Sequence, residues 1–136
     1  MTSVVLDTNV VMSAIFFGGT PLQVLRAWND GMVEVVVSDD VLDEYREIAA
    51  RMKAKFPSVD PDEWIDYIER NATKEAAPRL VEQVCEDADD DVFLACALAS
   101  GAKIVCSGDK LLLACNGWSG IEVLTPRAFI NRLADF

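Results

Sequence analysis

The chain has 136 residues, of which 51% are hydrophobic and 26% charged, and its formal net charge is −11. This length fits one domain, expected to span residues 1–136, with a sizeable apolar core. A simple nucleic-acid-binding module is usually basic, so the acidity argues against one. Histidine is absent, which excludes a Ser-His-Asp triad, a Cys-His pair and a histidine-ligated zinc. Catalysis would have to use carboxylates, hydroxyls, lysines or thiols.

Strand and helix patterns alternate along the chain. Short apolar runs rich in β-branched residues predict strands at residues 3–7, 33–38, 103–107 and 121–125. Because these runs are apolar throughout, they are typical of a parallel sheet that is covered on both faces. The expected fold is therefore an α/β protein, a three-layer α/β/α sandwich around a mostly parallel sheet of four or five strands.

Capping residues place the helices between these strands. Helices are predicted at residues 8–19, at 20–31 with Thr20 as N-cap, from Ser38 to residue 56, and at 60–71 with Asp60 as N-cap. Residues 72–88 carry no clear pattern. Three further helices are predicted after the acid run at 86–91, after Asp109, and from Pro126 onward.

The four cysteines and the N-terminus indicate a cytoplasmic protein. No cysteine forms a C-x-x-C pair, and each lies in or beside an apolar segment, so reduced, mostly buried thiols are expected. The start, MTSVVLDTN, has no basic region typical of a signal peptide. The longest apolar stretch, residues 92–106, is interrupted by Ser100, Gly101 and Lys103, so no membrane association is expected.

Two acids are predicted at the ends of strands. Asp7 ends the first strand and Asp109 follows the strand at 103–107. The carboxyl ends of parallel strands share one edge of the sheet, where ligands bind in open α/β folds. Both side chains should therefore lie at the same edge, although each is also a plausible cap.

Helical periodicity brings two more acids toward that edge. In the helix from Ser38, Glu44 lies at the border of the apolar stripe, whereas Asp43 and Glu47 lie on its wet side. In the helix after the acid run, Asp91 shares a face with buried positions four and seven residues on, so we expect it to turn inward. Preceding acids such as Asp89 are explained more simply as helix-start residues.

Carboxylates that converge repel one another and raise each other's pKa, and a hard divalent cation relieves this. Oxygen-only ligands indicate Mg²⁺ or Mn²⁺. With no histidine available, the fitting chemistry is metal-activated water attacking a phosphodiester. An acidic chain is compatible with such an enzyme, because its site must be acidic before the cations bind.

Four blocks in order resemble the PIN-domain family, in particular the toxin components of toxin–antitoxin systems. They are VVLDTNVVMSA, SDDVLDEYREI, DADDDVFLACALASGA and IVCSGDKLLL, with VLTPRAFI near the end. The resemblance implies a PIN-like fold and a Mg²⁺- or Mn²⁺-dependent ribonuclease with an antitoxin partner. The implied metal-binding and catalytic residues are Asp7, Glu44, Asp91 (alternatively Asp90) and Asp109, supported by Thr8, Asn9 and Ser107.

Substrate contacts are less sharply indicated. Basic residues on or near the Glu44 helix (Arg46, Arg51 and Lys53), together with Lys110, are candidate RNA contacts, or simply a solvated basic helix end. Large apolar side chains could form a homodimer or antitoxin groove, or pack in the core; they are Phe16, Phe17, Trp28 and Trp64.

Two rival functions remain open. A catalytically silent module that binds RNA or a partner protein would share the fold. A phosphate-handling domain of the haloacid-dehalogenase or receiver type would also place Asp at strand ends, but the first needs D-x-D where this chain has DTN. The second needs a phosphoacceptor Asp and a distal Lys that the sequence does not show.

Overall fold

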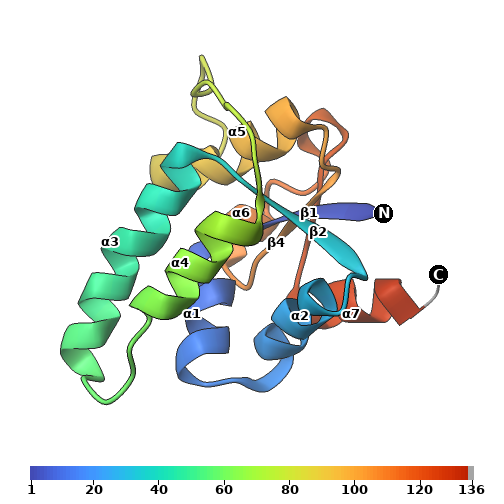
Figure 1. The fold of residues 1–136 in the computed structure, drawn as a ribbon. Helices are drawn as coiled ribbons and strands as arrows, with labels where there is room; N and C mark the ends of the chain where they lie inside the picture. The colour runs from blue at the N-terminus through green and yellow to red at the C-terminus, as the bar shows by residue number, and fades with distance from the viewer. Residues whose placement is uncertain (135–136) are drawn as a thin grey trace.

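The computed structural model describes residues 1–134. Helices and strands alternate along most of the chain (Figure 1). In chain order the elements are β1 (Thr2–Leu6), α1 (Thr8–Phe16), α2 (Gly19–Asn29), β2 (Val33–Val37), α3 (Asp39–Lys55), α4 (Asp62–Asn71), β3 (Thr73–Lys74), the 3₁₀ turn η1 (Ala88–Asp90), α5 (Asp91–Ser100), β4 (Ile104–Cys106), α6 (Lys110–Leu113), η2 (Trp118–Gly120), β5 (Glu122–Leu124) and α7 (Pro126–Ala134).

The strands form one parallel sheet in the order β3-β2-β1-β4-β5. β1 lies at the centre, and its pairing with β4 sets Leu6 beside Cys106. The residues that follow these two strands, Asp7 and Ser107, therefore emerge side by side at the carboxyl edge. The predicted parallel sheet and α/β class are confirmed.

Helices cover both faces of this sheet. α5 packs over β1, β2 and β4, whereas α2 and α7 contact each other on the opposite side (Figure 1). The core between them is apolar, and its largest fully buried side chains include Tyr45, Phe93 and Phe129. No single helix within residues 1–134 is long and apolar enough to cross a membrane; α1 and α2, bent by 99°, pass such a test only as a pair, by length and composition.

Two helix starts differ from the sequence prediction. α2 begins at Gly19, one residue before the predicted N-cap Thr20, because Gly18 takes a positive φ of 73° that glycine tolerates. α4 begins at Asp62, with Pro61 as N-cap. Asp60 still caps the turn, since its Oδ1 accepts a 3.0 Å hydrogen bond from the Asp62 N–H.

A fifth strand lies in the stretch for which the sequence showed no pattern. β3 has only 2 residues, and it pairs in parallel with the end of β2. Such a short edge strand buries too little side-chain surface to leave a pattern in the sequence. After it, residues 75–87 lead to η1 without forming a helix or strand.

One buried hydrogen bond ties α3 to the central strand. Tyr45, at 0% exposure, donates its hydroxyl to the Leu6 carbonyl across 2.6 Å, next to Asp7. We expect Tyr45→Phe to lower the free energy of unfolding by about 1–2 kcal/mol, because a buried bond is lost. Tyr67→Phe is the matched control, since the Tyr67 hydroxyl bonds Asn29 at the surface; urea titrations should show almost no change there. Equal losses in both variants would contradict this account.

Candidate metal centre

The carboxyl ends of β1 and β4 join two of the predicted site acids. Asp7 is only 3% exposed, and its Oδ2 accepts a 2.7 Å hydrogen bond from the Ser107 hydroxyl. The same Ser107 oxygen accepts the Asp109 N–H at 2.9 Å. Asp7 and Asp109 therefore lie at one edge of the sheet, linked through Ser107.

Burial is the main influence on Asp7. It raises the pKa of the Asp7 carboxyl, and the nearby Asp109 carboxylate raises it further. Hydrogen bonds from Ser107 and from the backbone of Thr8 and Asn9 act in the opposite direction. The net rise in pKa shows that negative charge at this position is incompletely compensated by the protein.

Asp90 is the third acid of this cluster. It is 8% exposed, and its Oδ2 has no hydrogen-bond partner within residues 1–134. Burial, followed by the carboxylates of Asp109, Asp7 and Asp87, raises the Asp90 pKa from 3.8 to about 7. A buried carboxylate oxygen without a partner is costly, so this atom is suited to a proton or a cation.

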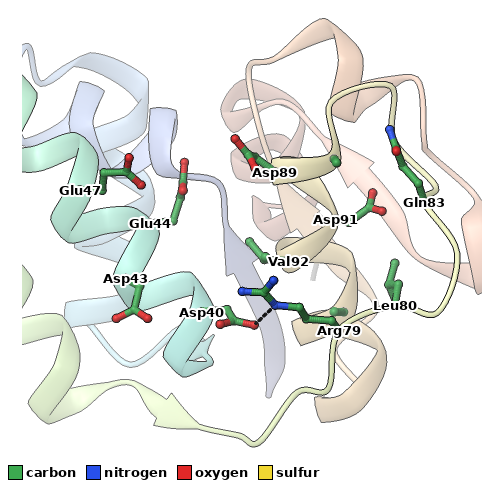
Figure 2. A pocket seen from close by; sticks show the side chains of 12 residues that line it. Asp40, Asp43, Glu44, Glu47, Arg79, Leu80, Gln83, Asp89, Asp91 and Val92 are labelled. Carbon is green, nitrogen blue, oxygen red and sulfur yellow. Dashed lines mark ion pairs between the residues drawn. The ribbon is translucent and has the colours of Figure 1, made fainter.

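Asp91 lines the same acidic pocket as Glu44, but its carboxylate is occupied by two backbone N–H groups rather than directed at Asp7 and Asp109. Its Oδ2 accepts the Val84 N–H at 2.9 Å and its Oδ1 accepts the Cys85 N–H at 2.8 Å. Figure 2 shows the Asp91 carboxylate on the Gln83 side, directed away from Glu44. The face that it was expected to share is also less buried than predicted, because Leu98 is 50% exposed.

Asp91 thus anchors the segment that leads into η1, and the alternative ligand Asp90 takes the inward place. Asp87 caps η1, since its side chain accepts the Asp89 N–H at 3.0 Å. This 3₁₀ turn carries Asp90 to the buried side just before α5 begins. The cluster that the structure assembles is therefore Asp7, Asp90 and Asp109.

Glu44 stands at the rim of an acidic pocket of about 430 Å³. It is half-buried at the border of the α3 stripe, as predicted, while Asp43 and Glu47 are exposed. Burial is the largest cause that raises its pKa, followed by Glu47, Asp89 and Asp7. In Figure 2, Glu44 and Asp89 project into the same space from α3 and from the turn before α5.

Two of the three residues predicted to support the site are buried in the fold, and one is exposed to solvent. Thr8 and Ser107 are buried, whereas Asn9 is exposed. The Thr8 hydroxyl oxygen has no hydrogen-bond partner in the described part of the chain. Thr8 is the first residue of α1 and directly follows Asp7. Its unpaired hydroxyl therefore belongs to the residue next to one of the clustered acids.

The donor set fits a hard divalent cation. All candidate ligand atoms are carboxylate oxygens, the Asp90 Oδ2 is buried and unpaired within residues 1–134, and the pKa values of Asp7 and Asp90 are raised. Within residues 1–134, however, no three side chains of the ligand-forming types are already arranged to hold an ion. The acids thus converge, and a cation would draw them closer.

Most of the predicted RNA-contacting cations lie in ion pairs. Arg46 pairs with Glu69, and the Arg51 guanidinium lies 2.8 Å from Glu47. Lys53 pairs with Asp62 at 3.3 Å. Lys110 is exposed at the start of α6, next to Asp109. Acidic neighbours thus offset the positive charge of the first three.

The chain is thus an open-sheet α/β protein with carboxylates gathered after β1 and β4, at the strand ends where such proteins bind ligands. A family model described as "PIN domain" matches residues 3–111, and the chain belongs to the PIN-domain family. This match confirms the predicted family. PIN domains are generally metal-dependent nucleases. No curated protein matches the chain significantly.

Solved structures support the same fold. PAE2754 from Pyrobaculum aerophilum superposes with a TM-score of 0.66 and 15% identity, over 99% of this chain and 91% of that one. The RRP44 PIN domain of T. brucei superposes with a TM-score of 0.52 and 17% identity, over 98% of this chain and 82% of that one. At these identities the likeness concerns the fold.

Proposed function

We propose that this protein is a metal-dependent endoribonuclease that hydrolyses RNA phosphodiesters. The observation that carries the proposal is the convergence of Asp7, Asp90 and Asp109, of which Asp7 and Asp90 are buried and Asp109 is partly exposed, and in which the Asp90 Oδ2 has no partner within residues 1–134. Membership of a family of nucleases and the absence of histidine from the sequence point to the same carboxylate chemistry.

In this proposal Asp7, Asp90 and Asp109 would hold Mg²⁺ or Mn²⁺, and Glu44 lines the neighbouring acidic pocket. A divalent cation in such a site supplies Lewis acidity, which lowers the pKa of water and offsets charge on a phosphodiester. Ser107 keeps the Asp7 carboxylate oriented through its 2.7 Å bond. The Leu111 N–H fixes Asp109 through its Oδ1 at 3.1 Å.

The biological role proposed here is that of the toxin in a cytoplasmic toxin–antitoxin pair. It is supported by the sequence blocks and by an apolar groove of about 800 Å³ between α1, α2 and α4, which includes Phe16, Trp28 and Trp64. Such a surface suits an antitoxin or a second copy of the chain. If the role is correct, producing the chain in bacteria should arrest growth, and Asp7→Asn should relieve the arrest.

The nuclease proposal is tested on a mixed RNA pool with Mg²⁺, Mn²⁺ or EDTA. We expect cleavage with either metal, none with EDTA, and a loss of at least about a hundredfold in Asp7→Asn, since weaker perturbations around metals already cost 10–100-fold. Circular dichroism should show that this variant is folded. RNA binding without cleavage under any divalent metal would favour the catalytically silent module instead, and full activity of Asp7→Asn would exclude the site.

A further inference from the structure

Two cysteines that are far apart in the sequence meet in the structure. The Cys115 thiol donates to the Cys85 sulfur across 3.0 Å, and the two residues are 30 positions apart. Cys85 lies before η1 and Cys115 lies after α6. All four cysteines are free thiols, and Cys115 is the one that is not fully buried.

We propose that Cys85 and Cys115 form a redox-active dithiol, which a small-molecule disulfide such as oxidised glutathione converts to an intramolecular disulfide. The sulfurs need to approach by about 1 Å, because a disulfide bond measures about 2.05 Å. This inference does not depend on the proposed nuclease activity.

The exchange runs in two balanced steps. The Cys115 thiolate, on the more accessible side, attacks one sulfur of oxidised glutathione, and one glutathione thiolate leaves. The Cys85 sulfur then loses its proton and attacks the Cys115 sulfur, which expels the second glutathione. The protein loses two electrons and two protons, and two molecules of reduced glutathione are formed.

The difference in burial decides the order of attack. Burial raises the pKa of the Cys85 thiol, and its neighbours Cys115 and Asp91 raise it further. Cys85 is therefore a poor first nucleophile. Once Cys115 carries the mixed disulfide, however, the Cys85 sulfur is already in contact with its target, so ring closure is favoured by proximity.

The bond would tie together the two segments that carry most of the acid cluster. The chain between residues 85 and 115 includes Asp90, Ser107 and Asp109. At one end, the Cys85 N–H is already held by Asp91. At the other end, the Cys115 N–H bonds the Leu112 carbonyl in the turn that follows Asp109. Oxidation would thus restrict the loop that presents these residues.

The test equilibrates the reduced full-length chain with mixtures of reduced and oxidised glutathione, then quenches it with acid. We expect the titratable thiols to fall from 4 to two, and the mass to fall by two hydrogens. Peptide mapping should join Cys85 to Cys115. The oxidised chain should unfold about 5–10 °C higher, because the cross-link restricts the unfolded state.

The variants separate this pair from the other thiols. Cys115→Ser should gain no intramolecular disulfide, whereas Cys96→Ser, which removes a buried thiol elsewhere, should oxidise like the parent chain. A stable glutathione adduct on Cys115, disulfide-linked dimers, or unchanged thiols at full oxidation would each overturn the proposal. Closure in Cys115→Ser would also overturn it.

Discussion

Replacing Asp90 by asparagine is expected to reduce metal-dependent RNA cleavage by at least about a hundredfold, whereas replacing Asp91 should change it by less than about tenfold. The Asp90 carboxylate is buried beside Asp7 and Asp109 and has an unpaired oxygen within residues 1–134. Asp91 uses both oxygens on backbone N–H groups. Initial rates on one RNA substrate at saturating Mn²⁺ measure the difference.

Asp91→Asn should instead weaken the fold. An amide presents one oxygen and one NH₂ group, so one of the two backbone N–H donors, of Val84 or Cys85, would face another donor. The expected loss in the free energy of unfolding is about 1–3 kcal/mol, the cost of an unsatisfied buried group. Asp89→Asn, at an exposed neighbouring position, is the control for both measurements. An inactive Asp91→Asn beside an active Asp90→Asn would restore Asp91 as the ligand.

Without metal, the contribution of Asp90 to the free energy of unfolding should fall as the pH rises from about 4 to 7. The folded chain holds the Asp90 proton up to about pH 7, whereas the unfolded chain releases it near 3.8. Protons therefore favour the folded state within this window, and the advantage is gone above it. In Asp90→Asn this carboxylate charge and its repulsion are absent, so at pH 8 the variant should be more stable than the parent by about 1–3 kcal/mol. A pKa shift of about three units corresponds to roughly 4 kcal/mol, and solvent screening reduces this value.

Urea titrations in EDTA at pH 5 and pH 8 measure this difference, with Asp89→Asn as the matched control. Mn²⁺ should then restore stability to the parent at pH 8, by about 2.7 kcal/mol at a hundred times its Kd, and should stabilise Asp90→Asn much less. If Asp90→Asn and the parent lost equal stability between pH 5 and pH 8, the loss in the parent could not be attributed to Asp90. These unfolding data also separate a loss of activity in Asp90→Asn from a loss of folding.

The sheet and two of its acids follow from local sequence. Uninterrupted β-branched runs at residues 3–7 and 103–107 are long enough to be recognised as buried strands. Since parallel strands end at one edge, the placement of Asp7 and Asp109 needs no knowledge of side-chain packing. β3 was missed because its 2 residues are held by pairing with β2, which leaves no periodic pattern.

Only the tertiary structure decides between Asp90 and Asp91. A helical wheel assumes 100° per residue, but the chain enters α5 through a 3₁₀ turn, which changes the direction of the side chains just before Asp91. Competition for the Asp91 carboxylate decides the rest, since the Val84 and Cys85 N–H groups reach it from a segment without a sequence pattern. The run of adjacent acids signalled that one of them is buried, and their local spacing could not show which.

The sequence by itself therefore determined the α/β class, the edge of the sheet at which acids gather, and the carboxylate chemistry available there. Those features depend on strand runs, on chain direction and on residue types, all of which are local. Which acid turns inward, and that Cys85 meets Cys115 across 30 positions, are decided by the tertiary structure. Both involve the segment between β3 and α5, whose Val84 and Cys85 N–H groups bond the Asp91 carboxylate and whose Cys85 sulfur meets Cys115. Contacts of this kind leave no periodic pattern in the sequence, so only the folded chain shows them.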